Sequence, residues 1–190
     1  MSTAQAQPQG RVKWTVADFA RIQDAGLFDG RHIELLDGEL YEVTKLPPHD
    51  FTVGALAGDL RALLPRNQYT VREEKSTEPW ENWWPEPDVS VARGPQRRYA
   101  HRRPGPGDLA MVAEVSYSSD QDWTKKLPGY AAAGIPIYWI VDLVHRRLEI
   151  HRDPGPAGYA VSEIVAEGEQ VELVIDNQSF GWIAVSDFLP

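Results

Sequence analysis

The stretch Leu109-Ala-Met-Val-Ala-Glu-Val-Ser116 decides the fold, because it is apolar almost throughout and carries a single carboxylate, Glu114. Such a run is typical of a central strand that is covered on both faces. Alternation along the strand places Val112, Glu114 and Ser116 on one face. A shielded carboxylate is costly unless a cation accompanies it. Glu114 therefore requires a lysine, an arginine or a metal, and this strand alone fits a plain buried ion pair as well as a functional site.

Downstream of this strand, the sequence predicts a helix, a second buried strand and a series of hairpins. Pro128 and Gly129 weaken the helix, and Gly-Ile-Pro at residues 134–136 ends it. The predicted downstream elements are a helix at 123–133, a buried strand at 137–142, and hairpin strands at 147–152, 159–165 and 171–175.

Upstream, the strongest signals are a capping box and a hairpin turn. Thr15 and Asp18 form the capping-box pattern, and Asp37-Gly38 separates two apolar-rich runs. The predicted upstream elements are a helix at 16–25, a hairpin of 32–36 and 39–43, a helix from 49 or 50 to 64, and strands at 69–75 and 88–92. This order predicts an α/β or α+β fold around one mixed sheet. We expect residues 1–10 to be a flexible tail and residues 11–190 to be a single domain.

Composition limits the class of protein. The hydrophobic fraction of 42% and the charged fraction of 25% are ordinary for a globular protein. Because the chain has no cysteine, disulfides, zinc–thiolate sites and thiol catalysis are excluded. The polar start MSTAQAQPQG does not have the pattern of a signal peptide, and no apolar run is long enough to span a bilayer. We expect a cytoplasmic protein without a membrane partner.

The net charge of −9 bears on possible partners. A protein that holds duplex DNA through a broad basic surface is usually cationic. Contact with nucleic acid would therefore be local, assisted by metal, or made by a dimer. Excess acid also fits a site that gathers carboxylates around a cation.

Three further residues are candidates for a site with Glu114. Asp88 follows Pro-Glu-Pro and is a turn residue unless it meets Glu114. Glu34 lies in the apolar run Ile-Glu-Leu-Leu, so the same burial argument applies to it. His49 follows Pro-Pro at a predicted helix start, where a histidine is often a cap or a surface group.

The helix after the Glu114 strand offers a basic partner. Lys126 and Tyr130 are four residues apart and share a helix face. A helix that packs back on its strand can bring that face over the strand end. Lys125 adjoins Lys126, so one of the two must point away, and a solvated Lys126 is the alternative.

Several short motifs occur together and in order along the chain. They are Glu34-Leu-Leu-Asp-Gly-Glu39, Pro-Pro-His49, Pro87-Asp88, Glu114-Val-Ser116, Lys126-Leu-Pro128, Tyr130, Ala-Gly-Ile-Pro136 and Tyr138-Trp-Ile-Val-Asp142. Each motif alone is weak evidence, but the ordered set is specific. Through this set the chain resembles the Uma-two family of restriction endonucleases, from about Trp14 to Leu189. This family belongs to the PD-(D/E)XK nuclease superfamily. The resemblance implies a restriction-endonuclease-like fold, with a mixed sheet flanked by helices, to which the predicted strands add C-terminal hairpins.

The resemblance also implies roles for the candidates. Asp88 corresponds to the Asp of the Pro-Asp motif, and Glu114 corresponds to the second acid. The superfamily usually has a lysine two residues after that acid, but here this position is Ser116. The lysine position is moved onto the following helix, where Lys126 matches it.

The chemistry that this resemblance implies is metal-assisted hydrolysis. The expected metal ligands are Asp88, Glu114, the carbonyl of Val115, and Glu34 directly or through water. Oxygen ligands suit magnesium or manganese, whereas zinc is disfavoured without cysteine and with scattered histidines. Lys126 would orient the nucleophile or neutralise developing charge. His49 and Tyr130 would position water or phosphate.

Two other clusters have competing interpretations. The loop at residues 93–107 is rich in arginine, and it either contacts phosphate or pairs with the acidic excess. The tryptophans at positions 80, 83 and 84 either stack on bases, pack within the chain or form a dimer contact.

Three functions therefore remain open. The first is a DNA endonuclease, the second is a protein that kept the nuclease fold as a catalytically silent binding or regulatory module, and the third is a nuclease that acts on RNA. The complete set of acids and Lys126 favours an active site, whereas the net charge of −9 favours unusual substrate engagement. The resemblance implies a homodimer.

Overall fold

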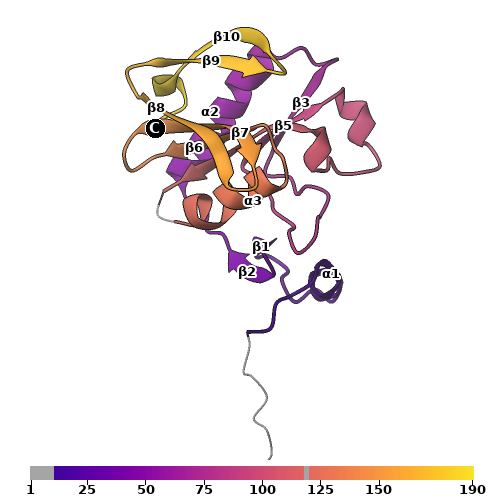
Figure 1. The fold of residues 1–190 in the computed structure, drawn as a ribbon. Coiled ribbons are helices and arrows are strands. Elements are labelled where there is room, and N and C mark those ends of the chain that lie inside the picture. Colours follow the sequence, from indigo (N-terminus) through magenta and orange to yellow (C-terminus); the bar gives the residue numbers. More distant parts are fainter. Residues whose placement is uncertain (1–10, 118–119) are drawn as a thin grey trace, which may run out of the picture.

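The computed structural model describes residues 11–117 and 120–190 and has a mixed α+β architecture (Figure 1). The strands are β1 (Ile33–Leu36), β2 (Glu39–Glu42), β3 (Tyr69–Glu73), β4 (Val89–Arg93), β5 (Leu109–Ser116), β6 (Ile137–Asp142), β7 (Arg147–Gly155), β8 (Gly158–Ala166), β9 (Gln170–Ile175) and β10 (Gln178–Ala184). The α-helices are α1 (Val16–Asp24), α2 (Pro47–Leu63) and α3 (Leu127–Ala132). A π-helical turn spans Asp122–Lys126, and 3-10 turns lie at Gln96–Tyr99, Pro106–Asp108 and Val185–Asp187. The N-terminal tail predicted at residues 1–10 falls outside the described residues.

The central sheet has the strand order β3-β4-β5-β6-β7-β8. Only the β5–β6 pair within this sheet is parallel, and its crossover contains the π-helical turn and α3. The hairpins β1–β2 and β9–β10 form separate two-stranded sheets. Figure 1 shows β1–β2 and α1 at one end of the molecule and β9–β10 at the other. The mixed sheet, the flanking helices and the C-terminal hairpins match the fold class predicted from the sequence.

Strand β5 is buried along its whole length, as its apolar sequence predicts. Met111, Ala113 and Val115 point into a core that they share with α2 and the β9–β10 hairpin. Val112 points into a second core on the opposite face, which includes Tyr130 of α3. Glu114 has the same parity as Val112, so its carboxylate enters the α3 layer rather than the α2 layer.

The helix predicted at residues 123–133 is interrupted. Residues Asp122–Lys126 form a wide turn in which the backbone N–H of Leu127 donates to the carbonyl of Asp122, and regular α-helix follows. Proline explains the change, because Pro128 has no N–H to donate to the carbonyl four residues earlier and its ring crowds that carbonyl. The helix begins again with Pro128 in its first turn, where no N–H is needed.

Other element boundaries differ modestly from the predicted ones. Helix α2 begins at Pro47 rather than at residue 49 or 50, since proline fits the first turn of a helix. Strand β3 ends at Glu73, and Asp88 lies just before β4 rather than inside it. Strand β10 was not predicted. The Asp37-Gly38 turn has φ of 50° and 74° at its two residues, the left-handed values that this hairpin type requires.

Candidate active site

Asp88 and Glu114 face each other across neighbouring strands. The β4–β5 register pairs Val89 with Ala113, and continuing it by one residue sets Asp88 opposite Glu114. The Asp88 N–H donates to Glu114 Oε2 at 3.4 Å, and the Val115 N–H donates to Asp88 Oδ2 at 2.8 Å. Both carboxylates are buried, with exposures of 7% and 1%. The sheet register therefore unites the two acids that the sequence analysis predicted as metal ligands.

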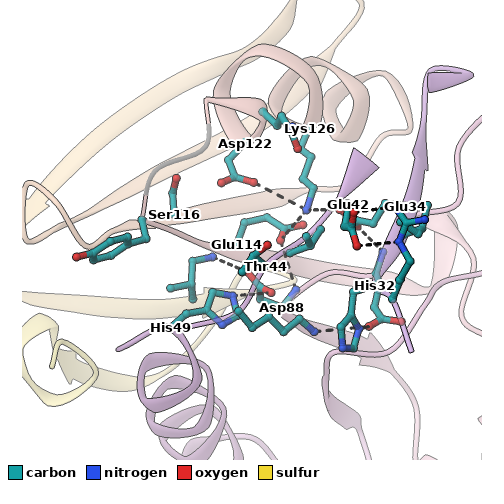
Figure 2. A pocket seen from close by; sticks show the side chains of 18 of the residues that line it. His32, Glu34, Glu42, Thr44, His49, Asp88, Glu114, Ser116, Asp122 and Lys126 are labelled. Carbon is teal, nitrogen blue, oxygen red and sulfur yellow. Dashed lines mark hydrogen bonds and ion pairs between the residues drawn. The ribbon is translucent and has the colours of Figure 1, made fainter. Parts of the chain in front are cut away.

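Lys126 reaches these acids from the turn that leads into α3, in the layer that the Glu114 carboxylate enters. Its Nζ lies 3.1 Å from Glu114 Oε2, 3.0 Å from Glu34 Oε2 and 3.8 Å from Asp122 Oδ1. Figure 2 shows the lysine descending from the π-helical turn towards these groups. Lys125 points away and pairs with an acid of the β1–β2 hairpin. Of the two adjacent lysines, Lys126 is therefore the one that faces the carboxylates.

Tyr130 fixes the second oxygen of Glu114. Its hydroxyl donates to Glu114 Oε1 at 2.7 Å, and the ring is fully buried. Burial and the nearby negative charge of Glu114 raise the pKa of this phenol well above its ordinary value, so Tyr130 stays a proton donor. One carboxylate oxygen is thus committed to Tyr130, while the other faces Lys126. Because Tyr130 is fully covered, it acts through Glu114.

Glu34 enters the site from strand β1. Its Oε1 accepts a hydrogen bond from the Glu86 N–H at 2.7 Å, and its Oε2 is the oxygen next to Lys126. The side chain is almost fully buried. The hairpin β1–β2 therefore contributes a carboxylate to a centre built mainly on β4, β5 and the following helical turn (Figure 2).

His49 lies in the first turn of α2 and is buried rather than exposed. Its Nε2 lies 3.0 Å from Asp88 Oδ1, and its Nδ1 lies 3.4 Å from Asp50 Oδ1. Burial disfavours the charged imidazole, but the hydrogen bond and the charge of Asp88 outweigh it and raise the pKa of His49. His49 is thus placed on the side of Asp88 that faces away from Val115.

The buried acids are not balanced by the cations around them. Glu34, Asp88, Glu114 and Asp122 all lie near the single amine of Lys126. Burial, only partly offset by Lys126, raises the pKa of Glu114 well above its usual range and also raises the pKa of the Asp122 carboxyl. A bound divalent cation would relieve this excess, and carboxylate oxygens are the ligands that hard cations prefer. The residues present therefore fit a metal.

These groups line a pocket of about 430 Å³. Its wall includes Glu34, His49, Asp88, Glu114 and Lys126, and acidic side chains outnumber basic ones around it. A pocket with this lining disfavours an anionic ligand unless positive charge is added. The pocket and its charge both favour a site that operates with a cation.

The arginine-rich loop pairs with acids instead of lining this pocket. Arg98 and Arg102 contact Asp108, and Arg93 contacts Asp176. Within the described residues, no member of the 93–107 loop lines the pocket. Of the two alternatives for this loop, the structure therefore has the pairing of its arginines with acids.

The tryptophan cluster packs within the chain. The rings of Trp80 and Trp83 are parallel, with centroids 6.2 Å apart, and Trp84 packs edge-on against Phe19. Trp83 also lies so close to Gly129 that a Cβ there would be 2.2 Å from the indole. Glycine at 129 is thus required by this contact, and the cluster joins the 77–87 segment to α3.

Two acids near the site were not candidates in the sequence analysis. Asp122 contacts Lys126 four residues later, across the π-helical turn, but the helix predicted from the sequence began at residue 123 and left Asp122 out. Glu74 follows β3 and lies beside Asp88, since its N–H donates to the Asp88 carbonyl at 2.9 Å. The pairing of strands β3 and β4 would have indicated Glu74, but a long loop separates these two strands in the sequence.

Comparison with known proteins places the chain in a family. The sequence model of the Uma2 family, described as putative restriction endonuclease, matches residues 16–185. The chain belongs to the Uma2 family. Among solved structures, it is similar to a putative nuclease belonging to DUF820 from Anabaena variabilis ATCC 29413, with a TM-score of 0.65 and 13% identity over 82% of this chain and 88% of that one. At that identity the likeness shows the fold. No curated protein matches the chain.

The Uma2 assignment agrees with the resemblance noted in the sequence. The family is one of nucleases, which are hydrolases that act on nucleic acid. In the described residues, none of the helices combines the length and apolarity that a bilayer span needs.

Proposed function

We propose that this Uma2 protein is a Mg²⁺- or Mn²⁺-dependent endonuclease that hydrolyses phosphodiester bonds of DNA. The observation that carries the proposal is the buried contact of Lys126 Nζ with Glu114 Oε2 at 3.1 Å, beside the hydrogen-bonded Asp88. A lysine and two carboxylates that share one pocket are the groups that metal-assisted phosphodiester hydrolysis uses.

The expected cation ligands are Asp88, Glu114, the Val115 carbonyl and, directly or through water, Glu34. The excess of buried acid over Lys126 supports this assignment. When bound, the cation would supply Lewis acidity and lower the pKa of a bound water. Magnesium and manganese both accept such oxygen donors.

The side chains have distinct tasks in this proposal. Lys126 donates hydrogen bonds to the attacking oxygen or to the scissile phosphate and offsets the negative charge that develops there. Tyr130 is a positioning residue, because its hydroxyl holds Glu114 Oε1 and leaves Oε2 directed at the pocket. His49 holds Asp88 Oδ1 from the α2 side and positions water or phosphate at the rim.

The test is cleavage of supercoiled plasmid DNA, single-stranded DNA and RNA by the full chain with Mg²⁺ or Mn²⁺. We expect DNA cleavage that Asp88→Asn and Lys126→Gln each reduce by about 100-fold or more. Lys125→Gln is the matched control, since it changes the adjacent lysine on the other side of the turn, and it should leave the rate unchanged.

The alternatives correspond to other outcomes of that test. Cleavage of RNA alone would replace DNA as the substrate. Nucleic acid binding without cleavage in either metal would overturn the enzyme and favour a silent binding module. Equal activity of Lys126→Gln and Lys125→Gln would overturn the role of Lys126.

We further propose that the protein acts in the cytoplasm as a homodimer, which the family resemblance implies. The net charge of −9 supports a metal-assisted or dimeric mode of engagement with DNA. Sedimentation equilibrium of the full chain measures the assembly directly, and a monomer at working concentration would contradict the dimer.

A further inference from the structure

Three residues on the outer side of Asp88 bring potential metal ligands together. One ligand atom from each of His49, Glu74 and Asp88 lies within 4.8 Å of the other two. His49 and Asp88 are buried, and Glu74 is partly exposed. His49 approaches Oδ1 of Asp88, whereas the Val115 N–H donates to Oδ2, so His49 lies on the other side of this carboxylate from Val115.

The strand register explains why Glu74 is there. Strands β3 and β4 pair Glu73 with Val89, so the next pair along is Glu74 with Asp88. The Glu74 N–H donates to the Asp88 carbonyl at 2.9 Å, which keeps this pairing beyond the regular strands. Since Asp88 is in turn opposite Glu114, three carboxylate residues form one row across β3, β4 and β5.

The histidine is oriented for a ligand on its Nε2 side. Its Nδ1 is 3.4 Å from Asp50 Oδ1, and its Nε2 is 3.0 Å from Asp88 Oδ1. A carboxylate at Nδ1 favours the tautomer with the proton on that nitrogen, as is usual for metal-bound histidines. Without metal, a proton on Nε2 makes this 3.0 Å approach a hydrogen bond to Asp88, and a bound ion would take the place of that proton.

We propose that His49, Glu74 and Asp88 bind a divalent first-row transition ion, such as Mn²⁺, at a second site that shares Asp88 with the Asp88–Glu114 centre. This inference rests on the proposed function, because Asp88 would be a ligand in both sites. Imidazole nitrogen is a good ligand for transition ions, whereas Mg²⁺ is bound chiefly by oxygen. This second site therefore prefers Mn²⁺ to Mg²⁺.

Lys45 is the natural competitor for Glu74. Its Nζ lies 3.0 Å from Glu74 Oε1 and 3.7 Å from Glu86 Oε1. When Glu74 turns to an ion, Lys45 keeps Glu86 as its acidic partner. Glu86 is also the matched control for Glu74, because the two side chains are 35% and 36% exposed and contact the same lysine.

The test uses Mn²⁺ alone as the probe and the full chain without nucleic acid. Pulsed electron paramagnetic resonance should show coupling of bound Mn²⁺ to a nitrogen nucleus, and His49→Gln should abolish it. Calorimetry should show that Glu74→Gln weakens one class of Mn²⁺ site by about tenfold or more, while Glu86→Gln leaves it within about twofold. When Mg²⁺ is added in excess, it should displace little of the Mn²⁺ bound at this second site.

Circular dichroism checks that each variant folds. Because His49 is buried, Glu74→Gln at a partly exposed position provides the decisive comparison if His49→Gln does not fold. Absence of nitrogen coupling in the unmodified protein, or equal Mn²⁺ affinity of Glu74→Gln and Glu86→Gln, would overturn the second site. Nitrogen-coupled Mn²⁺ in a protein that cuts no nucleic acid would instead overturn the nuclease and leave this site standing.

Discussion

Acidic and basic side chains meet at both ends of strand β4, but they are matched one to one at one end only. At the Arg93 end, the guanidinium Nη2 lies 2.6 Å from Asp176 Oδ1 and Nε lies 2.9 Å from Oδ2, with both side chains about one-third exposed. At the Asp88 end, buried carboxylates surround one amine, that of Lys126. One end is a hydrated, neutral pair, and the other is a shielded excess of negative charge.

Burial and charge balance separate a structural ion pair from a functional site. An exposed pair is worth about 0.2–1 kcal/mol, and it can form or break with little consequence. Buried acids without matching cations reduce stability, so a fold retains them only where something else requires them. At the Asp88 end, we propose that this requirement is a bound cation.

Removal of the Lys126 amine should have the largest effect. Lys126→Met leaves Glu34 and Glu114 buried without their cation, so the free energy of unfolding should fall by about 3–5 kcal/mol without metal. Mg²⁺ or Mn²⁺ should restore part of this loss by supplying positive charge. Urea unfolding with and without the cation measures both. Lys125→Met is the control, and a loss no larger than that of the control would contradict the buried-charge argument.

Tyr130→Phe should have an intermediate effect. It removes the hydrogen bond to a buried carboxylate, and the expected loss of unfolding free energy is about 1.5–3 kcal/mol. Tyr159→Phe removes a bond to the neutral Ile135 carbonyl and should cost about 0.5–1.5 kcal/mol. Urea unfolding measures both variants. Equal losses would show that Glu114, which accepts the hydrogen bond from Tyr130, behaves as uncharged.

Asp176→Asn tests the exposed end of β4. The hydrogen bond from Arg93 lowers the pKa of Asp176, although burial opposes it. Because the pKa of Asp176 is lower in the folded state than in the unfolded state, the pair stabilises the fold at pH values above the unfolded-state pKa. This contribution disappears as the pH falls through the folded-state pKa. At neutral pH the variant should lose less than about 1 kcal/mol, and the difference from the unmodified protein should vanish in acid. Thermal unfolding of both proteins, in steps of about one pH unit from about pH 2 to 7, measures this difference in stability. A difference that grows in acid would contradict the pairing of Asp176 with Arg93.

Arg102→Gln should have the smallest effect. Arg102 is held by Asp108, so its loss should leave DNA affinity and cleavage unchanged. Fluorescence anisotropy at several salt concentrations measures the affinity. A decrease of about one in the salt slope would mean that Arg102 contacts phosphate after all.

Several features were predictable because they depend on local sequence. The apolar run of β5 determines a doubly covered strand, and Asp37-Gly38 determines a tight hairpin turn. Strand β10 was missed although Asp176 and Asn177, both with left-handed φ, make the turn that leads into it. That turn has weaker sequence character than Asp-Gly, and the strand after it is largely exposed, so its apolar pattern is faint.

The sequence by itself determined that Glu114 lies in a buried strand and therefore needs a positive partner, because burial and ionisation are incompatible without one. Only the tertiary structure decided which groups meet it. Strand register set Asp88 and Glu74 in one row with Glu114, and a proline-induced π-helical turn aimed Lys126 rather than Lys125 at them. Register and turn geometry arise from contacts between distant segments, which no local pattern encodes.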